Sequence, residues 1–512
     1  MNETLAIRME NISKSFGEVK ANSNVKLELR RGEILSLLGE NGSGKTTLMN
    51  MLSGIYSPDE GKIFINGEEK TIRSPHDAFA AGIGMIHQHF KLVDVFTAAE
   101  NVALGAEGEK YNLKAVKAKI NEICALYGFE INPDQKVYNM SVSQKQTLEI
   151  IKVLYRGADI LILDEPTAVL TPQETDRLFA ILRAMRADGK AIIIITHKLN
   201  EVLEISDRIM IMRHGEYVDT IDTKDANEQL LSDMMVGKKV ELNIARSIPK
   251  YVQKRLEVSH LTCLNEYGLP VLSDVSFVAN GGEILGIAGI SGCGQKELLE
   301  SIAGLQKTEV GASISYFPPY QSEPKELIGK NPKQIREYGI SLSFVPEDRL
   351  GMGLVGSMGM TENMLLKNYG VGHSLFVETS AAKALSEKIL DELGVVTPSI
   401  NTPVRKLSGG NVQKVLVGRE IASAPTVLMT AYAVRGLDIN TSYTIYNLLE
   451  EQKKKGVAVI YVGEDLDVLL ALCDRILVLC AGRVNGILDA RTATKEQIGL
   501  LMTNLKEENG ND

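Results

Sequence analysis

The 512-residue chain lacks three features, each of which would point to a different class of protein. No apolar run approaches the roughly 20 residues that span a bilayer, and runs such as Ala191 to Ile195 are short. The five cysteines include no C-x-x-C pair, so a disulfide framework or a zinc site is not expected and a reducing cytoplasm fits. The net charge is -9, which disfavours broad nucleic-acid binding.

The N-terminal residues show no basic segment followed by an apolar stretch, so no signal peptide is expected. We therefore expect no direct membrane span, and association with a membrane only through a partner. Hydrophobic residues make up 44% of the chain and charged residues 24%, the balance of an ordinary globular protein. There is enough apolar material for more than one core.

An internal repeat organises the chain. The segment Arg31 to Leu35 (RGEIL) recurs as Gly281 to Leu285 (GGEIL). Later landmarks recur in the same order, namely Gly39 and Gly44 as Gly289 and Gly294, Glu100-Asn101 as Glu362-Asn363, and Asp207 to Ile209 as Asp474 to Ile476. We predict two homologous domains, 1–240 and 255–512, joined by a linker at 241–254 that contains Pro249.

Each half alternates short apolar runs with helical stretches. The runs Ile34 to Leu38, Ile160 to Leu163 and Ile192 to Ile195 are typical of buried strands. Residues Pro172 to Ala187 are typical of a helix between them. The alternation predicts an α/β fold with a largely parallel central sheet.

The first half contains a phosphate-binding loop. Residues Gly39 to Thr46 (GENGSGKT) match G-x-x-x-x-G-K-[ST], after a predicted strand and before a helix. In such a loop the backbone N–H groups face the phosphates, the lysine reaches the β- and γ-phosphates, and the Thr46 hydroxyl binds Mg²⁺. We assign nucleotide contacts to Gly39, Asn41, Gly42, Gly44, Lys45, Thr46 and Thr47.

Further candidate site residues follow other predicted strands of the first half. Asp164 and Glu165 end a buried run, where Asp164 can hold Mg²⁺ through its water shell and Glu165 can act as the general base for the attacking water. Gln88 is a candidate sensor of the γ-phosphate or the metal, and His197 a candidate γ-phosphate contact. Phe16 can stack on adenine. Taken singly, these last three also suit plain strand-end or core positions.

Together these residues resemble the ABC ATPase family over nearly the whole chain. Leu407 to Asn411 (LSGGN) looks like the signature motif of that family, which implies nucleotide contacts from Ser408, Gly409, Gly410 and Asn411. The resemblance implies two tandem ABC ATPase domains, each with a RecA-like core, a helical subdomain near 90–160 and again near 355–425, and an antiparallel β subdomain. It also implies head-to-tail pairing, in which each ATP lies between the P-loop of one domain and the signature of the other.

The tandem arrangement is similar to the ATPases of bacterial importers for simple sugars and nucleosides. Gln88 to Val93, Tyr155 to Asp159 and Val345 to Arg349 resemble the nucleoside-uptake branch, which works with lipoproteins of the basic-membrane-protein type. The implied partners are two integral-membrane permease subunits and, indirectly, a substrate-binding lipoprotein, with no nucleic acid. The chain would then lie peripherally at the cytoplasmic face of the cell membrane.

Two alternatives stay open from the sequence. One is an ATPase for a simple-sugar importer of the ribose or galactose type. The other is a soluble ABC translation factor, although that class usually has two intact sites and a long charged helical linker. For an importer, we expect the permease to dock on Phe90 to Ala103 and on Leu350 to Asn363.

The second half lacks the chemical groups of the first. Aligning the repeats pairs Lys45 with Gln295, Thr46 with Lys296, Asp164 and Glu165 with Ala431 and Tyr432, Gln88 with Glu347, and His197 with Glu464. The first half in turn has a degraded signature, Met140 to Gln144 (MSVSQ). Head-to-tail pairing then predicts one competent and one degenerate composite site. Nucleotide can still bind the degenerate site, because its P-loop glycines remain and Tyr267 is placed like Phe16.

Overall fold

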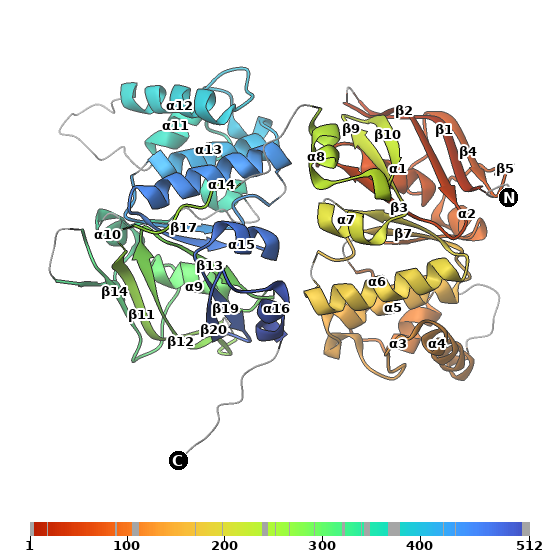
Figure 1. Ribbon diagram of the computed structural model, residues 1–512, viewed down its shortest axis with the longest axis horizontal. Helices are drawn as coiled ribbons and strands as arrows, with labels where there is room; N and C mark the ends of the chain where they lie inside the picture. The colour runs from red at the N-terminus through yellow and green to blue at the C-terminus, as the bar shows by residue number, and fades with distance from the viewer. Residues whose placement is uncertain are drawn as a thin grey trace, which may run out of the picture. The chain divides into compact units, whose positions relative to one another are not determined.

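The computed structural model divides into two compact units, Met1–Val240 and Glu241–Asp512, which we call the first and the second unit (Figure 1). Each unit combines a six-stranded sheet with a four-stranded sheet and surrounding helices. The structure describes residues 5–17, 19–87, 90–104, 112–168, 170–196, 198–237, 244–250, 252–265, 267–290, 292–319, 323–338, 340–342, 349–366, 379–422, 424–435 and 437–503.

The six-stranded sheet of the first unit has the strand order β10-β9-β3-β8-β7-β6. Neighbouring strands are parallel, except that β9 and β10 form an antiparallel hairpin at one edge. This result confirms the predicted α/β fold with a largely parallel sheet. The strands are β3 (Ile34–Gly39), β6 (Ile83–Ile86), β7 (Ile160–Asp164), β8 (Ala191–Ile195), β9 (Arg208–Arg213) and β10 (Glu216–Asp222).

Both faces of this sheet are covered, which explains why its central strands are apolar throughout. In β8, Ile193 and Ile195 pack with the antiparallel sheet and helix α1, whereas Ile192 and Ile194 pack with the helices on the other face. The covering elements are β1 (Leu5–Phe16), β2 (Val19–Arg30), β4 (Glu60–Ile65), β5 (Glu68–Glu69), α1 (Lys45–Leu52), α2 (Pro75–Ala80), α3 (Ala98–Ala103), α4 (Leu113–Tyr127), α5 (Val142–Tyr155), α6 (Pro172–Ala187), α7 (Leu199–Ile205) and α8 (Glu228–Val236).

The second unit repeats this topology with the order β16-β17-β18-β13-β19-β20, again parallel except for the last hairpin. Its helical subdomain is α11 (Met360–Leu365), α12 (Ser380–Leu393) and α13 (Gly409–Ala422). The other elements are β11 (Gln253–Leu264), β12 (Pro270–Gly281), β13 (Ile284–Ala288), α9 (Gln295–Ile302), β14 (Ser313–Tyr316), β15 (Lys325–Glu326), α10 (Pro332–Glu337), β16 (Ile340–Leu342), β17 (Val427–Ala431), α14 (Ile439–Lys454), β18 (Ala458–Val462), α15 (Leu466–Leu472), β19 (Arg475–Cys480), β20 (Arg483–Asp489) and α16 (Lys495–Thr503).

The described part of the join between the domains packs against the second unit. Arg246 Nη1 donates to the carbonyl oxygens of Leu470 and Cys473 at 2.9 and 2.6 Å. The Ser247 amide donates to Glu450 Oε1 at 2.7 Å. Strand β11 begins at Gln253, two residues before the predicted start of the second domain. Residues 244–250 therefore behave as the opening segment of the second unit.

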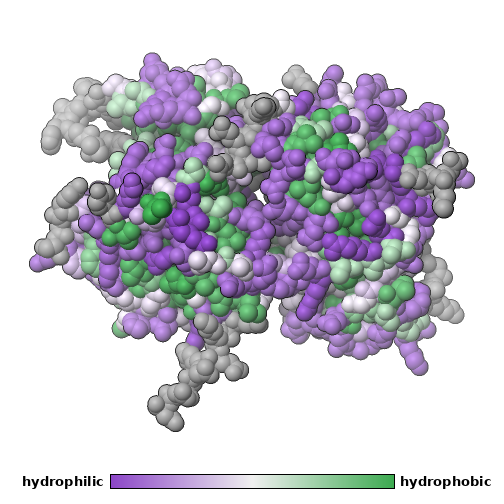
Figure 2. Space-filling model, viewed as in Figure 1, coloured by the Kyte–Doolittle hydropathy of each residue, from purple (hydrophilic) through white to green (hydrophobic). Residues whose placement is uncertain are grey.

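The surface and the helices bear on the expected lack of a membrane span. In the described part of the chain, no helix is both long enough and apolar enough to cross a membrane. Polar side chains predominate on the visible face of each unit, with smaller apolar patches among them (Figure 2).

All five cysteines are free thiols, three of them buried.

Candidate nucleotide site

The predicted phosphate-binding loop connects the end of β3 to the start of α1. Gly42 and Gly44 have φ angles of 82° and 91°, a left-handed backbone that favours glycine. A Cβ on Gly39 would collide with the Met212 carbonyl, and one on Gly44 with the Ala21 carbonyl. Glycine is therefore required at positions 39 and 44 by the close approach of β9 and β2, and at positions 42 and 44 by the left-handed backbone of the turn.

Lys45 lies inside the curve of this loop with only 7% of its surface exposed. Its ammonium group donates to the carbonyl oxygens of Gly39 at 2.7 Å and Glu40 at 2.9 Å. Burial lowers the pKa of Lys45 to about 8, while the charges of Glu165, Asp164 and Glu40 act to raise it. The loop therefore holds a cation at its centre whose charge depends on the nearby carboxylates.

The two carboxylates lie at the end of β7, the second strand from β3 in the sheet. Burial raises the pKa of Asp164 to about 6, the charge of Glu165 adds to the rise, and Lys45 opposes it. Glu165 adopts a φ of 51°, and its amide donates to the Ile195 carbonyl at 2.9 Å. Because the charges of both carboxylates act on the pKa of Lys45, Asp164 (the predicted metal ligand) and Glu165 (the predicted base) lie near the phosphate-binding loop.

The remaining predicted residues of the first unit fall into three groups. Gln88 and His197 lie outside the described residues. Thr46 and Asn41 are exposed, and Thr47 is half-buried. Phe16, at the end of β1, is 44% exposed and packs edge-on against Tyr56, with ring centroids 5.1 Å apart. An exposed aromatic face on this strand is compatible with stacking on a base.

The second unit keeps the same backbone with different side chains. Gly292 and Gly294 have φ angles of 87° and 98°, but Gln295 stands where the first unit has Lys45, and its amide nitrogen donates to the Ile290 carbonyl at 3.1 Å. Lys296 is turned outward and pairs with Glu300 at 3.8 Å. Tyr432 has a φ of 54° and bonds to the Val462 carbonyl, as Glu165 does to Ile195.

The two signature segments also differ in structure. In the second unit, Asn411 Nδ2 donates to Ser408 Oγ at 2.9 Å, and a Cβ on Gly410 would meet only Leu437, at 3.6 Å. Nothing within the unit therefore requires glycine at position 410. In the first unit, Ser141 and Gln144 form a capping box that closes the start of α5, with Gln144 N to Ser141 Oγ at 3.2 Å.

Three residues that the sequence had not singled out lie beside the predicted site. Thr167 follows the Asp164-Glu165 pair, Lys198 follows His197, and Glu201 lies in the first turn of α7. Hydrogen bonds join all three. No motif marks them in a single sequence, because their relation depends on two loops that are far apart in the chain.

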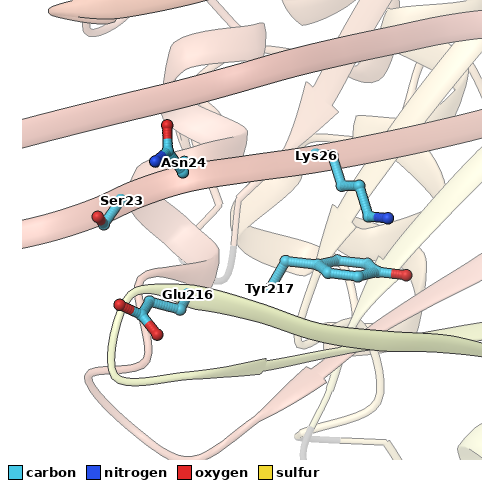
Figure 3. Close-up of a pocket in the computed structure, with 5 residues that line it drawn as sticks. All are labelled: Ser23, Asn24, Lys26, Glu216 and Tyr217. Carbon is cyan, nitrogen blue, oxygen red and sulfur yellow. The ribbon is translucent and has the colours of Figure 1, made fainter.

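A pocket of about 300 Å³ lies between β2 and β10 (Figure 3). Lys26 lies above the ring of Tyr217 with its ammonium 4.5 Å from the ring centroid. Ser23, Asn24 and Glu216 complete the lining. None of the predicted nucleotide-binding residues is among them.

Comparison with known proteins agrees with the topology and the loop chemistry. The model of the ABC transporter family matches residues 22–168 and again 272–430. The chain belongs to the ABC transporter family. It carries the nucleotide-binding ATPase domain of that family twice, which confirms the predicted tandem ABC ATPase architecture.

Curated relatives match this ABC chain along nearly its full length. It is 40% identical over 507 residues to the nucleoside import ATP-binding protein NupA of Lactococcus lactis subsp. cremoris, covering 98% of each chain. It is 40% identical to the guanosine import ATP-binding protein NupO of Bacillus subtilis, covering 97% of each chain. It is 38% identical to the glucose import ATP-binding protein TsgD13 of Haloferax volcanii, covering 97% of this chain and 95% of that one.

Proposed function

We propose that this chain is the ATP-hydrolysing subunit of an ABC importer whose solute is a nucleoside. The observation that carries the proposal is the buried Lys45 at the centre of an intact P-loop, electrostatically coupled to Asp164 and Glu165. Two relatives at 40% identity over almost the whole chain are named for nucleoside and guanosine import, which supports the solute class.

In this proposal the first unit contains the chemically active groups. Lys45 and the loop amides bind the phosphates, Glu165 accepts a proton from the attacking water, and Gln88 and His197 contact the γ-phosphate side. Phe16 stacks on the adenine. Negative charge that develops on the transferred phosphoryl group is stabilised by the Lys45 cation, which is pre-positioned by its two carbonyl contacts.

The donor set of the first unit fits Mg²⁺ bound together with ATP. Among the residues that the structure describes, no three His, Cys, Asp or Glu side chains come together as a metal site. Mg²⁺ in nucleotide enzymes is usually held by one or two carboxylates, substrate phosphates and waters rather than by a protein cage. The Asp164 carboxylate and the Thr46 hydroxyl suit that role, with Gln88 as a further ligand. The metal would neutralise phosphate charge.

The signature segment Ser408 to Asn411 is proposed to complete the active site, as the family's head-to-tail pairing implies. The lack of any internal demand for glycine at position 410 supports a contact made with a ligand. The second unit is proposed to be silent in hydrolysis, because Ala431, Tyr432 and Gln295 supply neither a metal carboxylate, a base nor a cation. It can still bind nucleotide through its loop amides and Tyr267.

The proposed permease contacts are two segments of similar structure, Phe90 to Ala103 and Leu350 to Asn363. Buried Asn101 accepts from the Val93 amide at 2.8 Å, and buried Asn363 accepts from the Val355 amide at 2.8 Å. Each asparagine thus holds a loop that exposes apolar side chains, including Val95 (66% exposed) in one and Met352 (57% exposed) in the other. A permease, peripheral attachment at the cytoplasmic membrane face and an associated lipoprotein follow as parts of this proposal.

The experiment is to purify the chain with its permease subunits and to measure phosphate release. Glu165→Gln should abolish turnover and leave ATP binding measurable, because it removes only the base. Tyr432→Phe is the matched control at the equivalent position of the second unit, and it should retain turnover. Near-normal turnover of Glu165→Gln would refute the assignment.

A simple-sugar importer is the second candidate, because the Haloferax relative is named for glucose import. Deleting the chain and measuring uptake of labelled guanosine and labelled ribose separates the two. Loss of guanosine uptake alone supports the nucleoside assignment, and loss of ribose uptake alone supports the sugar assignment. A translation factor would instead sediment with ribosomes, and the import names of the three relatives argue against it.

A further inference from the structure

We propose that Glu201 is a positioning residue for hydrolysis, acting through Thr167 and Lys198 on the two loops that carry Glu165 and His197. The inference rests on the proposed roles of Glu165 and His197. It concerns residues outside the phosphate-binding loop and the Asp164-Glu165 pair.

A closed set of hydrogen bonds connects the three residues. Thr167 Oγ1 donates to Glu201 Oε2. Lys198 Nζ donates to Glu201 Oε1 at 2.9 Å and to the Thr167 carbonyl at 3.2 Å. Each oxygen of the Glu201 carboxylate therefore holds a different loop, one after β7 and the other after β8.

The burial of this set gives its bonds more weight than surface ion pairs have. Thr167 is 2% exposed. The side chains of Glu201 and Lys198 are 15% and 31% exposed. Charge-assisted hydrogen bonds in partly buried positions are shorter and stronger than neutral ones, and they lose less to solvent screening. The set can thus fix the distance between the two loops.

The second unit lacks this set. The positions that match Thr167, Lys198 and Glu201 are Val434, Asp465 and Val468, none of which can repeat the bonds. There the two loops are connected differently, by an ion pair between Arg435 and Glu464 at 3.5 Å. Glu464 matches His197 in the alignment of the two repeats. The position that is proposed to contact the γ-phosphate in the first unit therefore forms an ion pair with Arg435 in the second.

The left-handed turn at Glu165 does not depend on this set of hydrogen bonds. Tyr432 in the second unit has the same left-handed backbone as Glu165, with φ angles of 54° and 51°, although it has no such set beside it. The turn therefore forms without Thr167 and Glu201. Their removal should leave the fold intact and change only the relative placement of the two loops.

Placement matters because a general base must lie within hydrogen-bond reach of the proton that it accepts. A misplacement of about 1 Å can cost about 100-fold in rate. Thr167→Val, which installs the residue of the second unit, and Glu201→Gln should each lower kcat by about 10- to 100-fold. The KM for ATP should change by less than about two-fold, because the phosphate-binding loop is untouched.

The test measures kcat, KM and equilibrium ATP binding for these variants in the assembled transporter. Thr167→Ser keeps the hydroxyl and should retain most of kcat. Glu204→Gln is the matched control, since Glu204 is on the same helix but pairs with Arg183 at 3.0 Å on the surface. Glu165→Gln is measured in parallel.

The outcomes separate the inference from the proposed function. If Glu165→Gln retains turnover, the proposed function fails. If Glu165→Gln abolishes turnover while Thr167→Val and Glu201→Gln keep normal kcat, only the positioning inference fails. It also fails if Thr167→Ser is as defective as Thr167→Val, if Glu204→Gln is equally impaired, or if ATP binding weakens as much as kcat.

Discussion

The two units share a backbone and differ in chemistry. The loop glycines Gly44 and Gly294 have φ angles of 91° and 98°, yet one is followed by a buried lysine and the other by a glutamine. The architecture is specified by the sheet order, the glycines and the covered faces, which tolerate the loss of every charged group at the site. The backbone of a phosphate-binding loop therefore forms without the lysine and the two carboxylates that accompany it in the first unit.

A second difference lies where the join meets the second unit. Lys453 and Asp474 form an ion pair at 3.0 Å whose side chains are 1% and 5% exposed, and Lys453 also donates to the Ser247 carbonyl at 2.7 Å. The matching pair of the first unit, Arg186 and Asp207, is 44% and 30% exposed. The same ion pair is thus at the surface in one unit and buried beneath residues 244–250 in the other.

The largest expected effect is on nucleotide binding at the two P-loops. Lys45→Ala should abolish turnover and weaken ATP binding, because the cation that neutralises the phosphates is lost. Gln295→Ala should spare most turnover, because a neutral amide is replaced. Phosphate release and equilibrium ATP binding check both, and comparable losses in the two variants would contradict the asymmetry.

The signature segments should show the opposite asymmetry. Ser408→Arg places a long side chain in the intact signature and should reduce turnover by at least about 100-fold, since donors that stabilise the transition state have effects of this size. Ser141→Arg, in the degraded segment of the first unit, should cost a helix cap and little activity. Equal activity of the two variants would break the proposed pairing.

The ion pairs predict unequal stability effects. Lys453→Met removes the buried cation that pairs with both Asp474 and Glu450, and leaves Asp474 only the partly exposed Arg491 at 3.4 Å. It should lower the free energy of unfolding by about 3–5 kcal/mol. Arg186→Met, at the exposed pair, should cost about 0–1 kcal/mol. Urea unfolding of the full chain measures both, and similar midpoints for the two variants would show that residues 244–250 do not seal the second unit.

The smallest expected effect is on pH dependence. Asp164, with its pKa raised to about 6, is ionised above that pH, and Lys45, with its pKa lowered to about 8, is charged below that pH. Mg-ATP affinity of the first unit should therefore be greatest between these values, falling on the acid side as Asp164 is protonated and on the alkaline side as Lys45 loses its proton. Titration of ATP affinity against pH checks this, with a flat profile as the contrary result.

Much of the fold and of the candidate nucleotide site could be predicted from the sequence, because the motifs that indicate them each lie within one short segment. The loop Gly39 to Thr46, the strand ending in Asp164 and the helix Pro172–Ala187 all depend on spacing within one segment. The Thr167, Lys198 and Glu201 set and the burial of Lys453 depend on loops that meet only in the folded chain. No single-segment pattern marks them, and for the same reason the prediction of a short linker at 241–254 did not include the contacts of Arg246 and Ser247 with the second unit.

We propose that the first unit hydrolyses ATP and that the second does not. Vanadate traps ADP in a site that has just cleaved ATP, so the assembled transporter should be labelled with a photoreactive azido-ATP and vanadate, and the labelled peptides identified. Label is expected in residues 1–240, at or near Phe16, and should be lost in Glu165→Gln. Vanadate-dependent label confined to residues 241–512, or retained in Glu165→Gln, would contradict it.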